Sequence, residues 1–337
     1  MSAPRAAVIG AGAWGTALAD LLARKGVPTT LWSHEPEVSE CIERDRVNCR
    51  YLDGVPLDER LRATSSMQEA VEGAAWVLSV SPSHVVRPVM TDAARYLAPD
   101  AVVVSASKGI ENESLMSMDE VLGEVLPPRA AAETVYLSGP SFALEVAQGH
   151  PTAVTVASRS AQAAERAQEL FQTPRFRVYT ASDVRGVELG GALKNVIAIA
   201  AGAAEGLGFG HNTRAALITR GLAEITRLGV AAGAQPRTFA GLAGMGDLIL
   251  TCTGALSRNR TVGFELGKGR QLPEILGSMA AVAEGVRTAR SARDLAARME
   301  IEMPIVETVY AMLYEGMAAR DAVEALMLRE PKAEHWS

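Results

Sequence analysis

Short runs of apolar residues alternate with longer amphipathic stretches through the first half of the chain. These runs are aliphatic or β-branched without regular polar alternation, and they lie at 6–9, 29–32, 76–80, 101–105 and 134–137. Such runs are typical of strands buried on both faces of a parallel sheet. Further strands are predicted at 152–157 and 176–179, with a helix between them. The order predicts an α/β fold of the Rossmann-like, doubly wound type.

The pattern changes after about residue 182, where strand signals stop and long Ala/Leu-rich helical patterns run almost to the end. We therefore expect two domains: a dinucleotide-binding domain at 1–185 and an all-helical substrate-binding and catalytic domain at 186–337. A small-molecule site is expected between them, because clefts between domains are favoured places for such sites.

A glycine-rich turn follows the first strand at once, with Gly10, Gly12 and Gly15 in the spacing G-x-G-x-x-G. Strand, glycine motif and helix in this order form the dinucleotide fingerprint. Gly10 permits the tight turn, Gly12 lets the backbone approach a pyrophosphate, and Gly15 lets the helix pack closely on the strand. The free N–H groups of the helix N-terminus attract phosphate.

The second strand ends in Ser33 and His34, with Glu35 one step further. An acidic residue at the strand end usually holds the ribose 2′-hydroxyl of NAD. Its absence removes repulsion against a 2′-phosphate, which favours NADPH slightly. If Glu35 takes the acidic role, NADH is preferred instead.

Polar loops follow three of the other buried strands, and ligands of open α/β sheets bind at such ends. Lys108 is well placed there for an anionic or carbonyl ligand. His84 is a candidate base, although a cap of the next helix is the stronger expectation. Gly139 allows close approach, and Ser141 can cap a helix or donate to a ligand.

The helical half begins with an apolar stretch, 189–199, that contains Lys194 and Asn195. A lysine without access to water loses solvation, so its pKa falls toward the range of a usable base. Glu188, outside the same turn, could restore some of the charge. The alternative is a lysine that extends its ammonium to solvent from an ordinary core helix.

Further polar positions follow in the helical half. Asp247 ends a glycine-rich turn, and Ser257, Arg258 and Asn259 form a cluster suited to phosphate, because guanidinium makes paired charge-assisted bonds. The same cluster also fits an ordinary polar helix start. Glycines at 202–210 indicate either an irregular backbone that lines a site or a close helix crossing. Residues 282–285 form another polar spot.

Composition narrows the class of protein. The chain has 337 residues, of which 48% are hydrophobic, and a net charge of -6, so we expect no nucleic-acid partner. The histidines are scattered and the three cysteines lack ligand spacing, which predicts reduced thiols and no metal site. We expect no secretory signal and no membrane insertion, because Lys194 and Glu205 interrupt the best apolar run. The expected location is the cytoplasm.

Several segments together resemble the bacterial-type NAD(P)-dependent glycerol-3-phosphate dehydrogenase. They lie in order along the chain from about 5 to 328, and they are 10–15, 138–143, 189–196, 206–210, 241–247 and 250–260. The glycine fingerprint is shared by many enzymes, whereas the later segments taken together are specific to this family.

The resemblance implies reduction of dihydroxyacetone phosphate to sn-glycerol 3-phosphate with NADPH or NADH, a step that supplies phospholipid synthesis. Lys194 matches the family's catalytic lysine. Substrate contacts are implied for Lys108, Gly139, Ser141, Lys194, Asp247, Ser257, Arg258 and Asn259. Cofactor contacts beyond the three glycines are implied for Ala13, Trp14, His34, Lys108, Ala143, Arg258, Val282 and Glu284. Ala13 lacks the side-chain hydroxyl that the family often carries there.

Two other functions fit parts of the pattern. A related β-hydroxy-acid dehydrogenase also uses a lysine on a helix, but it binds a carboxylate and needs no phosphate site. A non-catalytic dinucleotide sensor would have no use for a desolvated base. The partner is otherwise a small phosphorylated substrate, and the apolar helical surface is compatible with a homodimer as well as a monomer.

Overall fold

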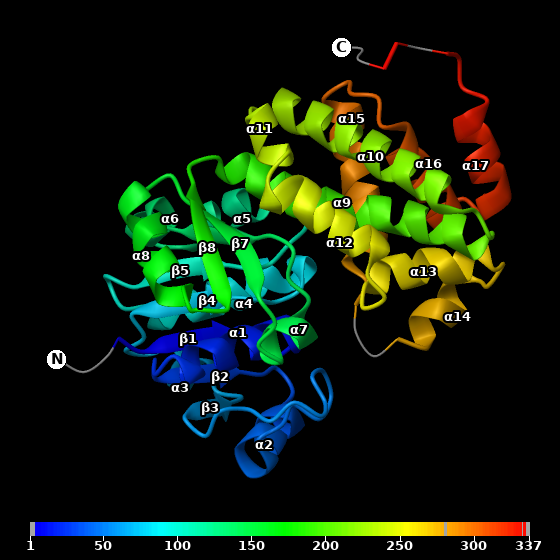
Figure 1. Cartoon of the computed structure of the whole chain (residues 1–337). Coiled ribbons are helices and arrows are strands. Elements are labelled where there is room, and N and C mark those ends of the chain that lie inside the picture. Colours follow the sequence, from blue (N-terminus) through cyan, green and yellow to red (C-terminus); the bar gives the residue numbers. More distant parts are fainter. Residues whose placement is uncertain (1–3, 280–281, 332, 335–337) are drawn as a thin grey trace.

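The computed structural model describes residues 4–279, 282–331 and 333–334. A sheet covered by helices forms the N-terminal half and a cluster of helices forms the C-terminal half, side by side (Figure 1). The predicted fold class, a Rossmann-like domain followed by a helical domain, is confirmed.

Within the described residues, the sheet has eight strands in the order β3-β2-β1-β4-β5-β6-β7-β8. Their bounds are β1 Ala6–Ile9, β2 Thr29–Trp32, β3 Leu61–Thr64, β4 Trp76–Ser79, β5 Val102–Ser105, β6 Val135–Ser138, β7 Thr152–Ala157 and β8 Phe176–Ala181. All neighbours pair in parallel except β6 and β7, which are antiparallel. The central strands are buried along their whole length, as their unbroken apolar runs predict.

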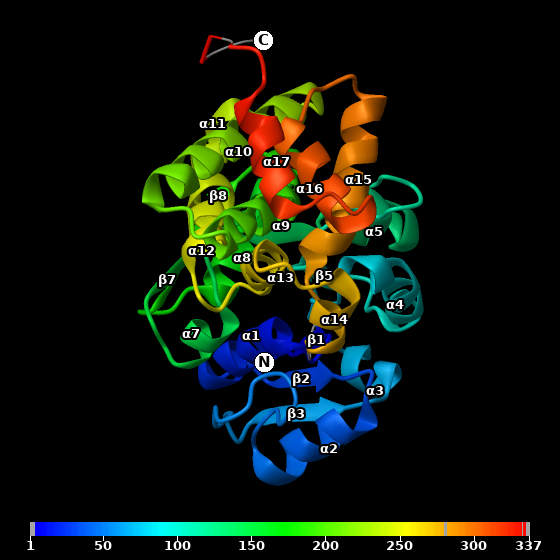
Figure 2. The same cartoon turned by 90° about the vertical axis from the view of Figure 1, so that its right-hand side faces the viewer.

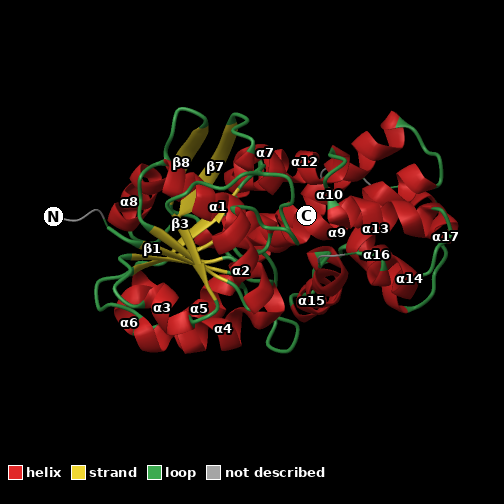
Figure 3. Ribbon diagram, turned by 90° about the horizontal axis from the view of Figure 1, so that it is seen from below, coloured by secondary structure: helices red, strands yellow, loops and turns green. Residues whose placement is uncertain are grey.

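Helices cover both faces of this sheet (Figure 3). They are α1 Ala13–Arg24, α2 Pro36–Asp45, α3 Met67–Val71, α4 Val86–Ala93, α5 Met118–Val125, α6 Pro128–Ala132, α7 Ala143–Ala147 and α8 Ala161–Phe171. Side chains of α1 and α8 share one hydrophobic core with the sheet, and those of α3, α4 and α5 share the other. The carboxyl ends of the parallel strands therefore stay open for a ligand.

The helical half is built around α9, Val184–Gly206, with the other helices packed about it (Figures 1 and 2). These are α10 His211–Ala231, α11 Pro236–Phe239, α12 Asp247–Thr253, α13 Arg258–Gly267, α14 Leu272–Gly277, α15 Glu284–Arg298, α16 Pro304–Tyr314 and α17 Ala319–Met327. A short π-helical turn, Leu242–Gly246, leads into α12.

The helix α9 is long and apolar enough to span a membrane, but 94% of its most apolar window is buried inside the protein. It is therefore a core helix. Its glycines serve a close helix crossing: a Cβ at Gly202 would lie 2.0 Å from the carbonyl oxygen of Arg260, and one at Gly206 would lie 2.2 Å from that of Phe264. Of the two interpretations of these two glycines, helix packing against α13 is the one that the structure supports.

Candidate active site

The glycine turn after β1 has the geometry that a dinucleotide needs. Gly10 has a φ of +118°, a conformation that L side chains rarely adopt. A Cβ at Gly15 would lie 1.9 Å from the carbonyl oxygen of Gly10, so the helix could not approach the strand with a larger residue. A Cβ at Gly12 would meet no atom within 4 Å. The backbone at Gly12 is thus open to an approaching phosphate.

The N-terminus of α1 also fits a bound phosphate. The helix begins at Ala13 without a side-chain cap and without an acidic residue in its first turn, so its N–H groups and partial positive charge are available. The buried indole nitrogen of Trp14 has no hydrogen-bond partner among the described residues. Ala143 starts α7, which packs against α1 at the same end.

A cation lies near the end of β2 that the strand-end pattern does not predict. His34 is exposed there, as expected for a ribose contact. Glu35 accepts a hydrogen bond from the hydroxyl of Tyr51 at 2.8 Å, and Arg50 Nη1 lies 3.8 Å from its carboxylate. Arg50 reaches this place from a loop, so the strand-end pattern gave no signal of it.

Two lysines share one buried carboxylate between the two domains. Lys194 Nζ on α9 lies 2.6 Å from Asp247 Oδ1, and Lys108 Nζ, from the loop after β5, lies 2.9 Å from Asp247 Oδ2. Asp247 begins α12 and is almost completely buried. The fold thus joins three predicted site residues that are far apart in sequence.

Burial controls the protonation of this triad. Burial lowers the pKa of Lys194 to about 8; the negative charge of Asp247 opposes this shift and the positive charge of Lys108 adds to it. For Asp247, burial alone would raise the pKa, but the two lysines outweigh it and lower the pKa. The expected alternative, an ammonium that reaches bulk water, does not occur, because the side chain of Lys194 is only 9% exposed.

The charge partner of Lys194 differs from the sequence expectation. Glu188, a possible source of compensating charge, instead accepts with its side chain a hydrogen bond from the backbone N–H of Asp119. Thr251 is an additional partner: its hydroxyl lies 2.9 Å from Lys194 Nζ. Thr251 follows Asp247 by one helical turn on α12, and this spacing places both on one face.

The N-terminus of α13 holds the predicted phosphate cluster. The Ser257 hydroxyl caps the helix by accepting the N–H of Arg260, so the cluster is also a regular helix start. Arg258 is exposed to solvent and can meet a ligand. The amide of Asn259 donates to Asn195 Oδ1 at 2.9 Å and accepts the N–H of Gly285 at 2.8 Å. Asn195, next to Lys194, is thereby linked to the phosphate cluster.

Residues 282–285 connect the helical domain to the sheet. The hydroxyl of Ser83, after β4, donates to Glu284 Oε2 at 2.7 Å. Val282 is exposed beside it. Glu284 also faces Gly109, the residue after Lys108, at the carboxyl edge of the sheet. This position is where a bound dinucleotide would cross between the domains.

Two helix-capping expectations are wrong. His84 lies inside the turn Ser83–Val85, and α4 begins after Val85 without a side-chain cap. Ser141 donates to the carbonyl oxygen of Gly139 at 3.0 Å, while Phe142 is the N-cap residue of α7. Gly139 has a φ of +142°, and a Cβ there would lie 3.0 Å from Val154 Cα, so the close approach is to β7.

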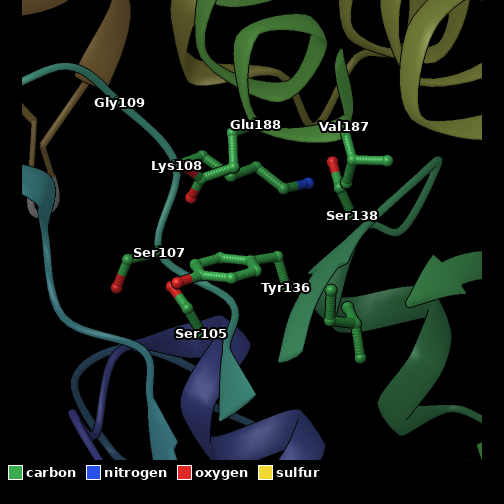
Figure 4. Close-up of a pocket in the computed structure, with 9 residues that line it drawn as sticks. Ser105, Ser107, Lys108, Gly109, Tyr136, Ser138, Val187 and Glu188 are labelled. Carbon is green, nitrogen blue, oxygen red and sulfur yellow. The ribbon is translucent and has the colours of Figure 1, made fainter. Parts of the chain in front are cut away.

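A small cavity of about 10 Å³ lies beside Lys108, with room for about one water molecule (Figure 4). Polar side chains from β5, the loop after it, β6 and α9 meet in it, among them those of Lys108, Ser138 and Glu188. The buried hydroxyls of Ser105 and Ser138 have no hydrogen-bond partner among the described residues. The cavity therefore offers unused hydrogen-bonding groups directly behind Lys108.

Comparison with known proteins identifies the family. The N-terminal and C-terminal profiles of NAD-dependent glycerol-3-phosphate dehydrogenase match residues 5–164 and 183–324. The chain is 61% identical to a glycerol-3-phosphate dehydrogenase [NAD(P)+] of Geobacter metallireducens, over 97% of this chain and 98% of the relative. The corresponding enzyme of Citrifermentans bemidjiense is 59% identical, over 98% of this chain and 99% of the relative.

Solved structures agree. A glycerol-3-phosphate dehydrogenase from Coxiella burnetii superposes with a TM-score of 0.92 at 38% identity, covering 97% of this chain and 99% of that one. The yeast enzyme superposes with a TM-score of 0.80 at 27% identity, over 96% of this chain and 99% of that one. The chain belongs to the NAD(P)-dependent glycerol-3-phosphate dehydrogenase family.

Proposed function

We propose that the protein catalyses the reversible reduction of dihydroxyacetone phosphate to sn-glycerol 3-phosphate with NADPH or NADH. The observation that carries this proposal is the pair of lysines on one buried carboxylate. Lys194 and Lys108 meet at Asp247 beside the carboxyl edge of a dinucleotide-binding sheet. Membership of the family supports the choice of substrate.

Lys194 is the proposed general acid and base for the C2 oxygen. When bound, a reduced nicotinamide supplies the hydride that C2 receives. Lys194 donates the proton that the new alkoxide needs, and it takes that proton back in the reverse direction. A pKa lowered to about 8 by burial keeps both protonation states accessible near neutral pH. Lys108 adds a second positive charge that stabilises the developing oxyanion.

Asp247 acts on the lysines as well as on the substrate in this proposal. Its two carboxylate oxygens hold the two ammonium groups in fixed positions. The remaining lone pairs of the carboxylate can accept a bond from a substrate hydroxyl. The fixed positions reduce the rearrangement needed when the substrate binds.

The phosphate of the substrate is proposed to bind at the N-terminus of α13. Ser257, Arg258 and Asn259 lie there, and a helix N-terminus favours anions. Arg258 provides a planar guanidinium that can form paired bonds with phosphate oxygens. Gly139 and Ser141, on the loop after β6, are proposed to close the substrate site from the sheet side.

The cofactor is proposed to lie along the carboxyl edge of the sheet, from the glycine turn to residues 282–285. The uncapped N-terminus of α1 and the open backbone at Gly12 fit its pyrophosphate. The other proposed contacts are Gly10, Ala13, Trp14, Gly15, His34, Lys108, Ala143, Arg258, Val282 and Glu284.

The test is the absorbance of reduced nicotinamide, followed with purified protein, dihydroxyacetone phosphate, and NADPH or NADH in parallel. Rapid oxidation of either cofactor is the expected result. A β-hydroxy acid that is reduced or oxidised in place of the phosphate would replace the proposal with a related dehydrogenase. Cofactor binding without any turnover would replace it with a dinucleotide sensor.

Four broader proposals concern location, metabolic role, domain bounds and assembly. The enzyme is proposed to work in the cytoplasm and to supply glycerol 3-phosphate for phospholipids. The division of the chain into 1–185 and 186–337 is tested by expressing the two parts separately. Homodimer formation is tested by sedimentation of the full chain.

A further inference from the structure

Glu188 is a carboxylic acid near the reacting groups that the proposed chemistry does not use. It lies on α9, N-terminal to Lys194, and lines the small cavity together with Lys108. Figure 4 shows its side chain descending from α9 toward that cavity. Its Oε2 accepts a hydrogen bond from the backbone N–H of Asp119 at 2.8 Å, in the first turn of α5.

A second residue of α9 holds the same end of α5. Arg185 Nη1 donates to Ser117 Oγ at 2.6 Å, and its Nη2 donates to Glu120 Oε1 at 2.9 Å. Arg185 and Glu188 are three residues apart and therefore lie on one face of the helix. Together they dock α9 on the N-terminus of α5, which belongs to the dinucleotide-binding half.

This docking point is joined to the loop that carries Lys108. The loop runs from β5 to α5, and Ile110 pairs with Ser117 in an isolated antiparallel bridge. The backbone N–H of Glu111 also donates to the carbonyl oxygen of Met116 at 2.9 Å. The base of the loop is thus closed at Ser117, the residue that Arg185 holds.

The next turn of α9 touches Lys108 itself. A Cβ at Gly191 would lie 2.8 Å from Ser138 Oγ and 3.5 Å from the Lys108 Cδ. The missing side chain at Gly191 leaves room for the Ser138 hydroxyl, and the stem of Lys108 packs at van der Waals distance beside it. Glu188, Gly191 and Lys194 follow one another at intervals of three residues, from the docking point to the general acid.

We propose that Glu188 is a positioning residue for the reaction. By docking α9 on the first turn of α5, it sets the position of Lys194 relative to Lys108, so that both ammonium groups reach Asp247. The kinetic consequence of this inference rests on the proposed function. Its structural part rests on the contacts of Glu188 and Arg185 with the start of α5.

The surroundings of Glu188 favour its neutral form over its ionised form. Burial raises the pKa of Glu188 well above its usual value, and the negative charge of Asp119 adds to the shift, while Arg185 opposes it. Other titratable side chains face Glu188 from the neighbouring elements. They are Lys108 after β5, Glu120 on α5, Tyr136 on β6 and Arg159 after β7. A glutamine has the same shape as the neutral acid: it can accept from the Asp119 N–H and donate to a carboxylate.

The experiment compares Glu188→Gln and Glu188→Ala with Glu224→Ala. Glu224 is a matched control because it is a buried glutamate that accepts the backbone N–H groups of Ile305 and Val306 at the start of α16. For each protein we would measure the melting temperature, and kcat and KM for dihydroxyacetone phosphate and NADPH, well below that temperature.

Glu188→Gln should keep kcat within about twofold of the wild type, since the hydrogen bonds are retained. Glu188→Ala should lower kcat by roughly tenfold or more, because small displacements of a catalytic group are costly, and it should leave KM for NADPH nearly unchanged. Glu224→Ala should lower the melting temperature without changing kcat. This split separates positioning from a general loss of stability.

Two kinetic results would overturn the inference. An unchanged kcat in Glu188→Ala would show that the position of Lys194 relative to Lys108 does not depend on Glu188. A kcat in Glu188→Gln as low as in Glu188→Ala would show that the reaction needs an ionised carboxylate. If the wild type itself turned over no dihydroxyacetone phosphate, the proposed function would fail, and amide hydrogen exchange would test the docking instead. Faster exchange of the Asp119 N–H in Glu188→Ala than in the wild type would support the docking. Equal exchange rates in the two proteins would reject it.

Discussion

The ammonium nitrogen of Lys194 lies 2.6 Å from a carboxylate oxygen of Asp247, and both side chains are buried. The second oxygen of the same carboxylate lies 2.9 Å from Lys108 Nζ. One buried carboxylate therefore compensates the positive charge of two ammonium groups. A second anion, such as a substrate phosphate nearby, would find a net positive environment.

Replacing Lys194 with Ala should reduce kcat by about 10²- to 10⁴-fold, the usual contribution of a general acid. The cofactor contacts lie elsewhere, so NADPH should still bind with nearly unchanged affinity. Oxidation of NADPH gives the first quantity and fluorescence titration the second. Turnover close to that of the wild type would remove Lys194 from the mechanism.

The pH dependence of the two directions should be opposite. Reduction needs the protonated lysine and oxidation needs the neutral one. Because burial lowers the pKa of Lys194 to about 8, the kcat/KM for reduction should fall as pH rises through that value, while that for oxidation should rise. Initial rates in both directions over a pH series provide the measurement. A reduction rate that increases through this range would contradict the assignment.

Replacing Arg258 with Ala should raise KM for dihydroxyacetone phosphate by roughly ten- to a hundredfold, through the loss of a charge-assisted contact with phosphate. Arg260 provides the control, because it is on the same helix but pairs with Glu205. Its replacement by Ala should leave that KM nearly unchanged. Equal effects of the two substitutions on KM would indicate a general disturbance of α13.

Arg50 should contribute to the choice of cofactor. Its guanidinium is half exposed near Glu35 at the end of β2, where a 2′-phosphate would lie. Arg50→Ala should raise KM for NADPH by about tenfold, since a charge-assisted contact is lost, and should change KM for NADH much less. The ratio of the two KM values is the quantity to compare with the wild type, and an unchanged ratio would exclude this role.

Glu224 should give the protein a distinct pH dependence of stability. Burial raises its pKa from 4.5 to about 7 in the folded protein, although two backbone N–H groups oppose the shift. Below pH 4.5, Glu224 is neutral in both the folded and the unfolded protein, and its contribution to the free energy of unfolding is fully present. This contribution is lost as the pH rises through the folded-state pKa of about 7.

Relative to Glu224→Gln, the wild type should thus lose roughly 3 kcal/mol of stability between those two pH values. Urea unfolding of both proteins over a pH series tests this, since the other carboxylates cancel in the difference. A difference that stays constant with pH would show that Glu224 does not titrate there.

Local patterns in the sequence were sufficient to predict the glycine turn, most strands and the buried lysine helix. The strand β3 was missed, since in Leu61–Thr64 only Leu61 is buried and the other residues show no apolar pattern. The reversed direction of β7 and β8 is not predicted either, because composition and burial pattern do not reveal the direction of a strand.

Side-chain partners were predicted less well than elements. Glu188 was the nearest carboxylate in sequence to Lys194, but Asp247, on another helix, is its partner. The structure turns Glu188 toward α5 instead. Arg50 and Thr251 were not singled out, because their roles depend on which loops and helices meet, and single-sequence patterns contain no such information.

The location of Lys194 in the middle of α9 links loss of activity on heating to unfolding of the helical domain. The segment that opens last in a protein is the one with the most buried contacts, and α9 is buried along most of its length. A molecule that keeps α9 in place keeps its general acid, and one that loses α9 loses the domain with it. A partly heat-inactivated preparation should therefore be a mixture of fully active and fully inactive molecules. The specific activity of the molecules that stay folded should equal that of the untreated protein.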